Sequence, residues 1–326
     1  MTQHVLRLAL SALLVALSVP AAAQQPQSIP RVGYLSTRPA EMEQLLLPAF
    51  LHGLRELGYT EGKNIIIERR YGAEGQHDKL RELVAELVRL KVDVIAVIGP
   101  DATAAAKAAT TTIPIVFINS PDPVGLGLVE SLARPGGNVT GLTDFHGHLG
   151  SKRLELLKEV VPAAARIAFL SMAGSLTAPL QWQELQAAAP GLGVTLLAVE
   201  VAGPDDVDRA FTALAQARPE ALVVHPTVTY TTSRIFAFAV QHRLPAIYTV
   251  PQWVEAGGLM SYGAHFPDLW RRAATYVHKI LQGTKPADLP VEQPMKFELV
   301  INLHTAEQMG LSIPPAVLFQ ADRVIK

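Results

Sequence analysis

The stretch RVGYLST (residues 31–37) recurs later in the chain as RIAFLSM (residues 166–172). Three further pairs of similar segments follow in the same order. They are residues 94–100 with 221–226, 113–117 with 244–248, and 136–141 with 257–263. Any one match could arise by chance among alanine- and valine-rich segments, but four in one order indicate an internal repeat. A repeat of this length predicts two similar lobes.

The repeated segments belong to a longer series of short apolar runs that alternate with helical stretches. The runs are RVGYLS (31–36), NIIIERR (64–70), VDVIAVI (92–98), PIVFIN (114–119), RIAFLS (166–171), VTLLAVEV (194–201), ALVVH (221–225) and PAIYTV (245–250). Alternation of strands with helices of this length is typical of βαβ units and of parallel sheets buried on both faces. The predicted fold class is α/β.

The N-terminal residues have the pattern of a secretory signal peptide. Arg7 precedes an apolar run at residues 8–19, and small residues end it at Ala21-Ala22-Ala23. The run is too short to span a bilayer, so we expect cleavage after Ala23 and export of the remaining chain. Residues 1–23 are therefore expected to be absent from the mature protein.

The composition of the chain excludes several classes of function. The chain has no cysteine, which rules out disulfides, thiol catalysis and cysteine metal sites. It has 28 basic and 29 acidic side chains, for a net charge of −1, and no marked run of either sign. We therefore expect no nucleic-acid partner and no binding to an anionic membrane.

The loops at the carboxyl ends of the predicted strands are the candidate ligand site, because open α/β sheets bind ligands there and two facing lobes form a cleft. The candidates are Ser36, Thr37, Pro100, Thr103, Ser120 and Asp122 in the first copy, and Met172, Ser175, His225, Thr227, Gln252, Trp253 and Tyr262 in the second. Helix N-termini after these strands suit a carboxylate, and Asp122 suits an ammonium group. This chemistry indicates an amino acid or a related small carboxylate.

Several candidates also have a purely structural interpretation. Asp101 and Thr103 have the residue types and position of helix caps. Asp122 lies between two prolines, where a carboxylate commonly accepts hydrogen bonds from turn N–H groups. Trp253 and Tyr230 are suited either to stacking on a ligand or to sealing the second lobe.

Enzyme motifs are incomplete in this chain. Gly125-Leu-Gly127 has Glu130 where a dinucleotide-binding loop needs its third glycine. Neither Ser120 nor Ser175 lies in a G-x-S-x-G frame, as a hydrolase nucleophile would. We expect no enzymatic activity and no cofactor.

His146 and His148 lie close together in the sequence and resemble half of a metal site. A metal site needs further ligands, and the pair lies in a loop beside the last repeated segment of the first copy. We interpret them as a solvated surface pair and expect no metal.

Longer blocks resemble a known family, the ABC transporter substrate-binding proteins, which include tryptophan- and tyrosine-binding members. These blocks include FLHGLRELGYTEGKNIIIERRYG (50–72), DPVGLGLVESLARPGGNVTG (122–141) and ILQGTKPADLPVEQPMKFELVINLHTAEQMGL (280–311). The resemblance covers essentially all of the chain after the signal peptide. It implies the type I periplasmic binding protein fold, with two Rossmann-like lobes, a three-stranded hinge and closure on a small solute.

The same resemblance implies the boundaries of the lobes and the partner. Residues 31–140 and about 264–298 would form the first lobe, and residues 141–263 and about 299–326 the second. The hinge would cross near residues 139–143, 259–263 and 299–302. The protein would be a periplasmic monomer that delivers its solute to an ABC permease in the inner membrane. A receptor module that presents the bound solute to a membrane signalling partner is the alternative.

Overall fold

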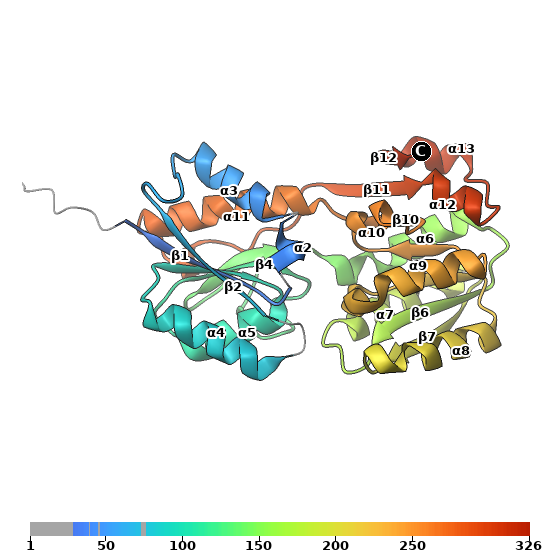
Figure 1. Cartoon of the computed structure of the whole chain (residues 1–326), viewed down its shortest axis with the longest axis horizontal. Helices are drawn as coiled ribbons and strands as arrows, with labels where there is room; N and C mark the ends of the chain where they lie inside the picture. The colour runs from blue at the N-terminus through green and yellow to red at the C-terminus, as the bar shows by residue number, and fades with distance from the viewer. Residues whose placement is uncertain (1–28, 39, 45, 73–75) are drawn as a thin grey trace, which may run out of the picture.

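The computed structural model describes residues 29–38, 40–44, 46–72 and 76–326. Two α/β lobes lie side by side along the long axis of the molecule (Figure 1). The predicted signal peptide at residues 1–23 lies outside the described residues. Within the described part of the chain, no helix is long and apolar enough to cross a membrane.

The first lobe contains a five-stranded parallel sheet with the order β2-β1-β3-β4-β5. Its strands are β1 (Arg31–Ser36), β2 (Ile66–Tyr71), β3 (Val94–Ile98), β4 (Ile115–Ser120) and β5 (Val139–Thr143), and its helices are α2 (Ala40–Glu43), α3 (Leu47–Glu56), α4 (His77–Arg89), α5 (Pro100–Ala109) and α11 (Phe266–Leu281). Successive side chains of a strand point to opposite faces. Val94 and Ala96 therefore pack in the core under α3 and α11, whereas Ile95 and Val97 pack in the core under α4 and α5.

The second lobe contains a seven-stranded sheet with the order β12-β11-β10-β9-β8-β6-β7, in which only the β10–β11 pair is antiparallel. Its strands are β6 (Arg166–Met172), β7 (Thr195–Val201), β8 (Ala221–Val224), β9 (Ala246–Tyr248), β10 (Met260–Ala264), β11 (Phe297–Asn302) and β12 (Arg323–Ile325). Its α-helices are α6 (Gly150–Val160), α7 (Ala178–Ala188), α8 (Val207–Ala217), α9 (Thr232–Gln241), α10 (Pro251–Glu255), α12 (Leu303–Gln308) and α13 (Pro315–Gln320). The short 3₁₀ helices of the chain are η1 (His146–Leu149), η2 (Pro190–Leu192), η3 (Pro204–Asp206), η4 (Pro226–Thr231) and η5 (Pro286–Asp288).

The two sheets repeat one strand order, as the internal sequence repeat predicts. The order β2-β1-β3-β4-β5 of the first lobe matches β7-β6-β8-β9-β10 of the second. The four matched sequence pairs correspond to β1 with β6, β3 with β8, β4 with β9, and β5 with β10. The predicted α/β class with two parallel-sheet lobes is therefore confirmed.

Three connections join the lobes. The chain leaves β5 for η1 and α6, returns from β10 into α11, and passes back along β11 to the second lobe. Figure 1 shows α11 beside α3 in the first lobe, although the strands before and after it, β10 and β11, belong to the second sheet. β5 stays in the first sheet to Thr143, so this crossing follows residue 143 rather than the expected boundary at 141.

Candidate functional site

A cavity of about 270 Å³ lies between the lobes, at the carboxyl ends of both sheets. It is lined from the first lobe by Thr37, Arg38, Ile98, Gly99, Pro100, Asp101 and Asn119, from the crossing after β5 by His146, and from the second lobe by Met172, Gly174, Ser175, Leu176, Thr177, Pro226 and Thr227. Open parallel sheets bind their ligands at this edge. The cavity thus occupies the position at which two such sheets can hold one solute together.

The wall from the first lobe is formed where β3 turns into α5. Gly99 has φ 88°, a conformation that favours glycine, and Pro100 begins the helix after it. The Gly99 N–H donates to Oδ1 of Asn119, at 3.1 Å, which fixes the loop after β3 against the end of β4. The positive end of the α5 dipole is therefore directed at the cavity.

The wall from the second lobe is formed by the loops after β6 and β8. Ser175 Oγ accepts hydrogen bonds from the N–H groups of Thr177, at 3.3 Å, and Ala178, at 3.0 Å, at the start of α7. The Met172 N–H donates to Thr227 Oγ1 at 3.2 Å and joins the two loops. The side chain of Leu176 remains 64% exposed and gives this wall an apolar surface.

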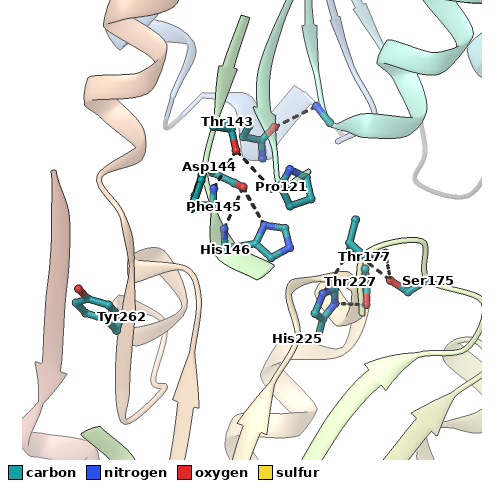
Figure 2. A network of polar contacts seen from close by, with 12 residues as sticks. Pro121, Thr143, Asp144, Phe145, His146, Ser175, Thr177, His225, Thr227 and Tyr262 are labelled. Atoms are coloured by element: carbon teal, nitrogen blue, oxygen red, sulfur yellow. Dashed lines mark hydrogen bonds and ion pairs between the residues drawn. The ribbon is translucent and has the colours of Figure 1, made fainter. Parts of the chain in front are cut away.

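His225 lies under the second-lobe wall and contacts two of its threonines (Figure 2). Its side chain is fully buried, with Nδ1 2.9 Å from Thr227 Oγ1 and Nε2 3.4 Å from Thr177 Oγ1. Burial lowers the pKa of His225 well below its usual value, and the nearby His146 and Arg153 lower it further. His225 is therefore a neutral residue that orients hydroxyl groups.

Asp144 and His146 form a buried pair at the end of the crossing from β5. His146 Nδ1 lies 3.1 and 3.0 Å from the two carboxylate oxygens of Asp144. Burial alone raises the pKa of Asp144, but attraction to His146, hydrogen bonds from it and the charge of Arg153 together lower it. Asp144 is thus an ionised group at neutral pH.

Arg153 of α6 interacts with both members of this pair. It is fully buried, and it donates from Nε to the carbonyl oxygen of Tyr262 and from Nη1 to that of His146, both at 2.7 Å. Burial lowers the pKa of Arg153 to about 9, against the opposing effects of Asp144 and Tyr262. The guanidinium therefore ties η1 to β10 beside the cavity.

Five of the predicted site residues line the cavity, namely Thr37, Pro100, Met172, Ser175 and Thr227. Three lie behind the lining. The Ser36 hydroxyl donates to Glu43 at 2.9 Å, the Thr103 hydroxyl donates to the Gly99 carbonyl at 2.7 Å, and His225 contacts the two threonines. These three side chains act on the loops of their own lobe.

The remaining five predicted residues lie outside the lining. Asp122 Oδ1 accepts the Gly125 N–H at 2.8 Å within a turn. Trp253 packs in the second-lobe core, and Tyr262 stacks on Phe297 at a centroid distance of 6.2 Å. Ser120 and Gln252 also lie away from the cavity lining.

The candidate set lacked the other lining residues, among them Arg38, Asn119, His146, Leu176 and Thr177. The interpretation of His146 and His148 as a solvated pair is wrong for His146, which is only 9% exposed. Asp144, placed directly after a hinge strand and two positions before His146, is the signal that could have identified it. Among the described residues, no group of three His, Asp or Glu side chains could hold a metal ion.

Comparison with known proteins gives related chains of similar length. A family model described as ABC transporter substrate binding protein matches residues 44–325. A tyrosine-binding protein of Clostridioides difficile is 28% identical over 265 residues, covering 80% of this chain and 75% of that protein.

Two solved structures are also similar over most of their length. An ABC domain from Streptococcus pneumonia in complex with L-Trp is 27% identical, with a TM-score of 0.84 over 91% of this chain and 100% of that one. A conserved domain protein from Vibrio cholerae is 30% identical, with a TM-score of 0.84 over 91% of this chain and 99% of that one. These likenesses confirm the family resemblance and the two-lobed fold of type I periplasmic binding proteins.

Proposed function

The chain belongs to the ABC transporter substrate-binding protein family, and from that premise we propose that it captures an amino acid, or a related small carboxylate, and delivers it to an ABC permease. The family binds solutes and is not a class of enzymes. The observation that carries the proposal is the cavity at the carboxyl ends of two parallel sheets, lined from both lobes.

The size and lining of the cavity support a solute of amino-acid size. Its volume of about 270 Å³ lies near the lower end of the range for ligand pockets. Ile98, Met172 and Leu176 supply apolar surface, and Thr37 and Thr177 supply hydroxyl groups. Two similar proteins, a tyrosine-binding protein and a domain solved in complex with L-Trp, support the same class of solute.

Closure of the lobes is the proposed means of capture. A solute that contacts Thr37 and Pro100 on one side and Met172, Ser175 and Thr227 on the other favours the arrangement in which the lobes are close. The three connections between the lobes would act as the hinge. The closed form would then be the one that the permease recognises.

Within this proposal the protein works as a monomer in the periplasm, after removal of residues 1–23. Purification from the periplasmic fraction, followed by mass spectrometry, tests the location of the protein and the removal of residues 1–23. We expect a chain that begins at Gln24 and a small solute released on denaturation.

A thermal-shift screen tests the class of solute. The solute is removed by unfolding, the chain is refolded, and each of the twenty L-amino acids is added. At a concentration of 100 Kd, one site stabilises the folded protein by about 2.7 kcal/mol. The amino-acid assignment fails if none raises Tm while an unrelated solute does.

A pair of variants locates the binding site. Leu176→Asp places a charge in the cavity wall, and we expect it to weaken binding at least about tenfold. Phe319→Asp is the matched control, because Phe319 is 93% exposed in α13 and does not line the cavity. Equal affinities in the two variants would place the solute elsewhere.

A further inference from the structure

The first lobe contains a buried carboxyl group directly behind the cavity wall. Glu43, at the end of α2, is fully buried. It accepts hydrogen bonds from the Tyr34 hydroxyl, at 2.6 Å, and from the Ser36 hydroxyl, at 2.9 Å. Burying a carboxyl group costs free energy unless donors of this kind satisfy it. The further contacts of the two hydroxyl groups therefore indicate what Glu43 holds in place.

Both hydroxyl groups connect Glu43 to one residue of the cavity lining, Arg38. Ser36 Oγ accepts the backbone N–H of Arg38 at 3.0 Å. The Tyr34 hydroxyl accepts the indole N–H of Trp270 at 2.9 Å, and the Arg38 guanidinium lies over this indole ring. One buried carboxyl group is thus linked to Arg38 twice, through its backbone and through the ring that its side chain contacts.

The Arg38 side chain lies on two aromatic rings from the first two turns of α11. Its guanidinium carbon is 6.0 Å from the ring centroid of Phe266 and 5.7 Å from that of Trp270. Both aromatic side chains are buried in the first-lobe core. A guanidinium that lies on aromatic faces is held in one orientation, and the N–H groups at its edge remain available for an anion.

The position of Arg38 in the cavity gives this arrangement a use. Among the described residues that line the cavity, Arg38 is the one lysine or arginine. The positive end of the α5 dipole is directed at the same first-lobe wall and also favours an anion. Asp101, in the first turn of α5, supplies the opposite charge to this wall, which suits the ammonium group of an amino acid.

We propose that Arg38 binds the carboxylate of the solute and that Glu43 is its positioning residue. The inference rests on the proposed function and adds to it the residue that holds the carboxylate and the buried network that orients this residue. A guanidinium and a carboxylate can form two parallel N–H···O bonds, which an amide cannot match. The carboxylate is thereby assigned to the first lobe, and the second-lobe wall is left to the rest of the solute.

Isothermal titration calorimetry on the mature protein tests the role of Arg38. The probes are the twenty L-amino acids, simple aromatic and dicarboxylic acids, and the primary amide of every acid that binds. The titrations are run at about pH 6, where the ammonium groups of the amino acids and of their amides are charged. We expect the acid to bind at least about tenfold more tightly than its amide, because the amide lacks the charge and the second acceptor oxygen.

Three variants assign this preference to a residue. Arg38→Gln removes the charge and keeps a polar side chain, so we expect most of the preference for the acid to be lost. Arg38→Lys keeps the charge without the planar fork and should keep part of it. Arg81→Gln is the matched control, because the Arg81 side chain is 68% exposed in α4 and lies outside the cavity lining. It should bind both probes as the wild type does.

Two further variants test the positioning network. Tyr34→Phe keeps the ring but removes the hydroxyl that joins Glu43 to Trp270. Phe266→Leu removes one of the two rings under the guanidinium. We expect each to lower the ratio of acid to amide affinity, because a binding group must be held in its productive orientation. Circular dichroism and Tm measure the stability of each variant separately, and a loss of stability with an unchanged ratio would make the network purely structural.

The outcomes distinguish this inference from the proposed function. If the wild-type protein binds none of the probes, both are contradicted. If it binds an acid but does not prefer it to the amide, or if Arg38→Gln keeps the wild-type preference, only the role of Arg38 is overturned.

Discussion

At the scale of single residues, the most consequential side chain is Asp144, because two other buried polar groups, His146 and Arg153, interact with its charge. It is 1% exposed, it accepts from His146, and it lies near the Arg153 guanidinium. An ionised carboxylate at this depth is stable only while its partners are present. Arg153 depends on Asp144 in turn, because the buried guanidinium loses the attraction of this carboxylate if Asp144 is neutral.

Asp144→Asn should therefore lower the free energy of unfolding by about 3 kcal/mol at pH 7. The folded-state pKa of Asp144 is lowered from its usual 3.8, so its ionisation stabilises the fold above that pH and less as pH falls through the folded-state value. Urea denaturation at pH 7 and pH 3 should show the difference between wild type and variant shrinking at pH 3.

Asp205→Asn is the control for this measurement. Asp205 is exposed in η3, and neutralising it should leave stability unchanged at both pH values. If the stability difference between Asp144→Asn and the wild type were as large at pH 3 as at pH 7, the loss would come from side-chain packing rather than from charge.

At the scale of elements, β5 and β10, the strands that precede two of the connections between the lobes, have the same steric requirement. A Cβ at Gly141 would lie 2.1 Å from the Phe117 carbonyl oxygen, and one at Gly263 would lie 2.3 Å from that of Thr249. Phe117 lies within β4 and Thr249 directly follows β9, so in each lobe the strand passes close to the backbone of the preceding strand or of the residue after it. The repeated glycines of the sequence are explained by this close approach.

Gly141→Ala and Gly263→Ala should each destabilise the protein by about 2 kcal/mol or more, because the clashing atoms are backbone and cannot rotate away. Gly191→Ala is the matched control, since no atom lies within 4 Å of a Cβ there. Urea denaturation of the three variants measures the difference. If all three variants were equally stable, β5 and β10 would be able to move away from the Phe117 and Thr249 backbone and make room for the added Cβ.

The elements differ in how well the sequence predicts them. All eight predicted apolar runs correspond to strands. Six of them are buried almost throughout, and the two edge strands, β2 and β7, are partly exposed. β5, β10 and β11 contain polar residues or glycine and are not among the apolar runs. The internal repeat pairs the segments of β5 and β10, and the family resemblance pointed to all three strands. β12, at Arg323–Ile325, is too short to carry a pattern and is held by its pairing with β11.

At the scale of the whole molecule, the proposed closure predicts that the lobes approach each other when the solute binds. The chain has no cysteine, so introduced cysteines can be labelled specifically. Asp78→Cys in α4 and Asp208→Cys in α8 lie in different lobes, and their side chains are 90% and 81% exposed. Energy transfer between dyes at these sites should increase as solute is added.

A pair of labels within one lobe controls for effects on the dyes. Asp78→Cys with Glu56→Cys places both dyes on the first lobe, and transfer between them should not change. A constant signal from the first pair, at a solute concentration that saturates binding, would contradict closure.

The sequence by itself determined the α/β class, the two similar lobes and the succession of most strands along the chain. These features follow from local patterns that repeat along the chain, and each strand buries the same kind of side chain wherever it lies. Only the tertiary structure decided which polar groups face the cavity. Ser36 and Thr103 follow strands as the lining residues do, yet each turns to an acceptor in its own lobe. His146 lines the cavity because α6, α7 and β10 pack around η1, and contacts between such distant segments leave no local pattern in the sequence.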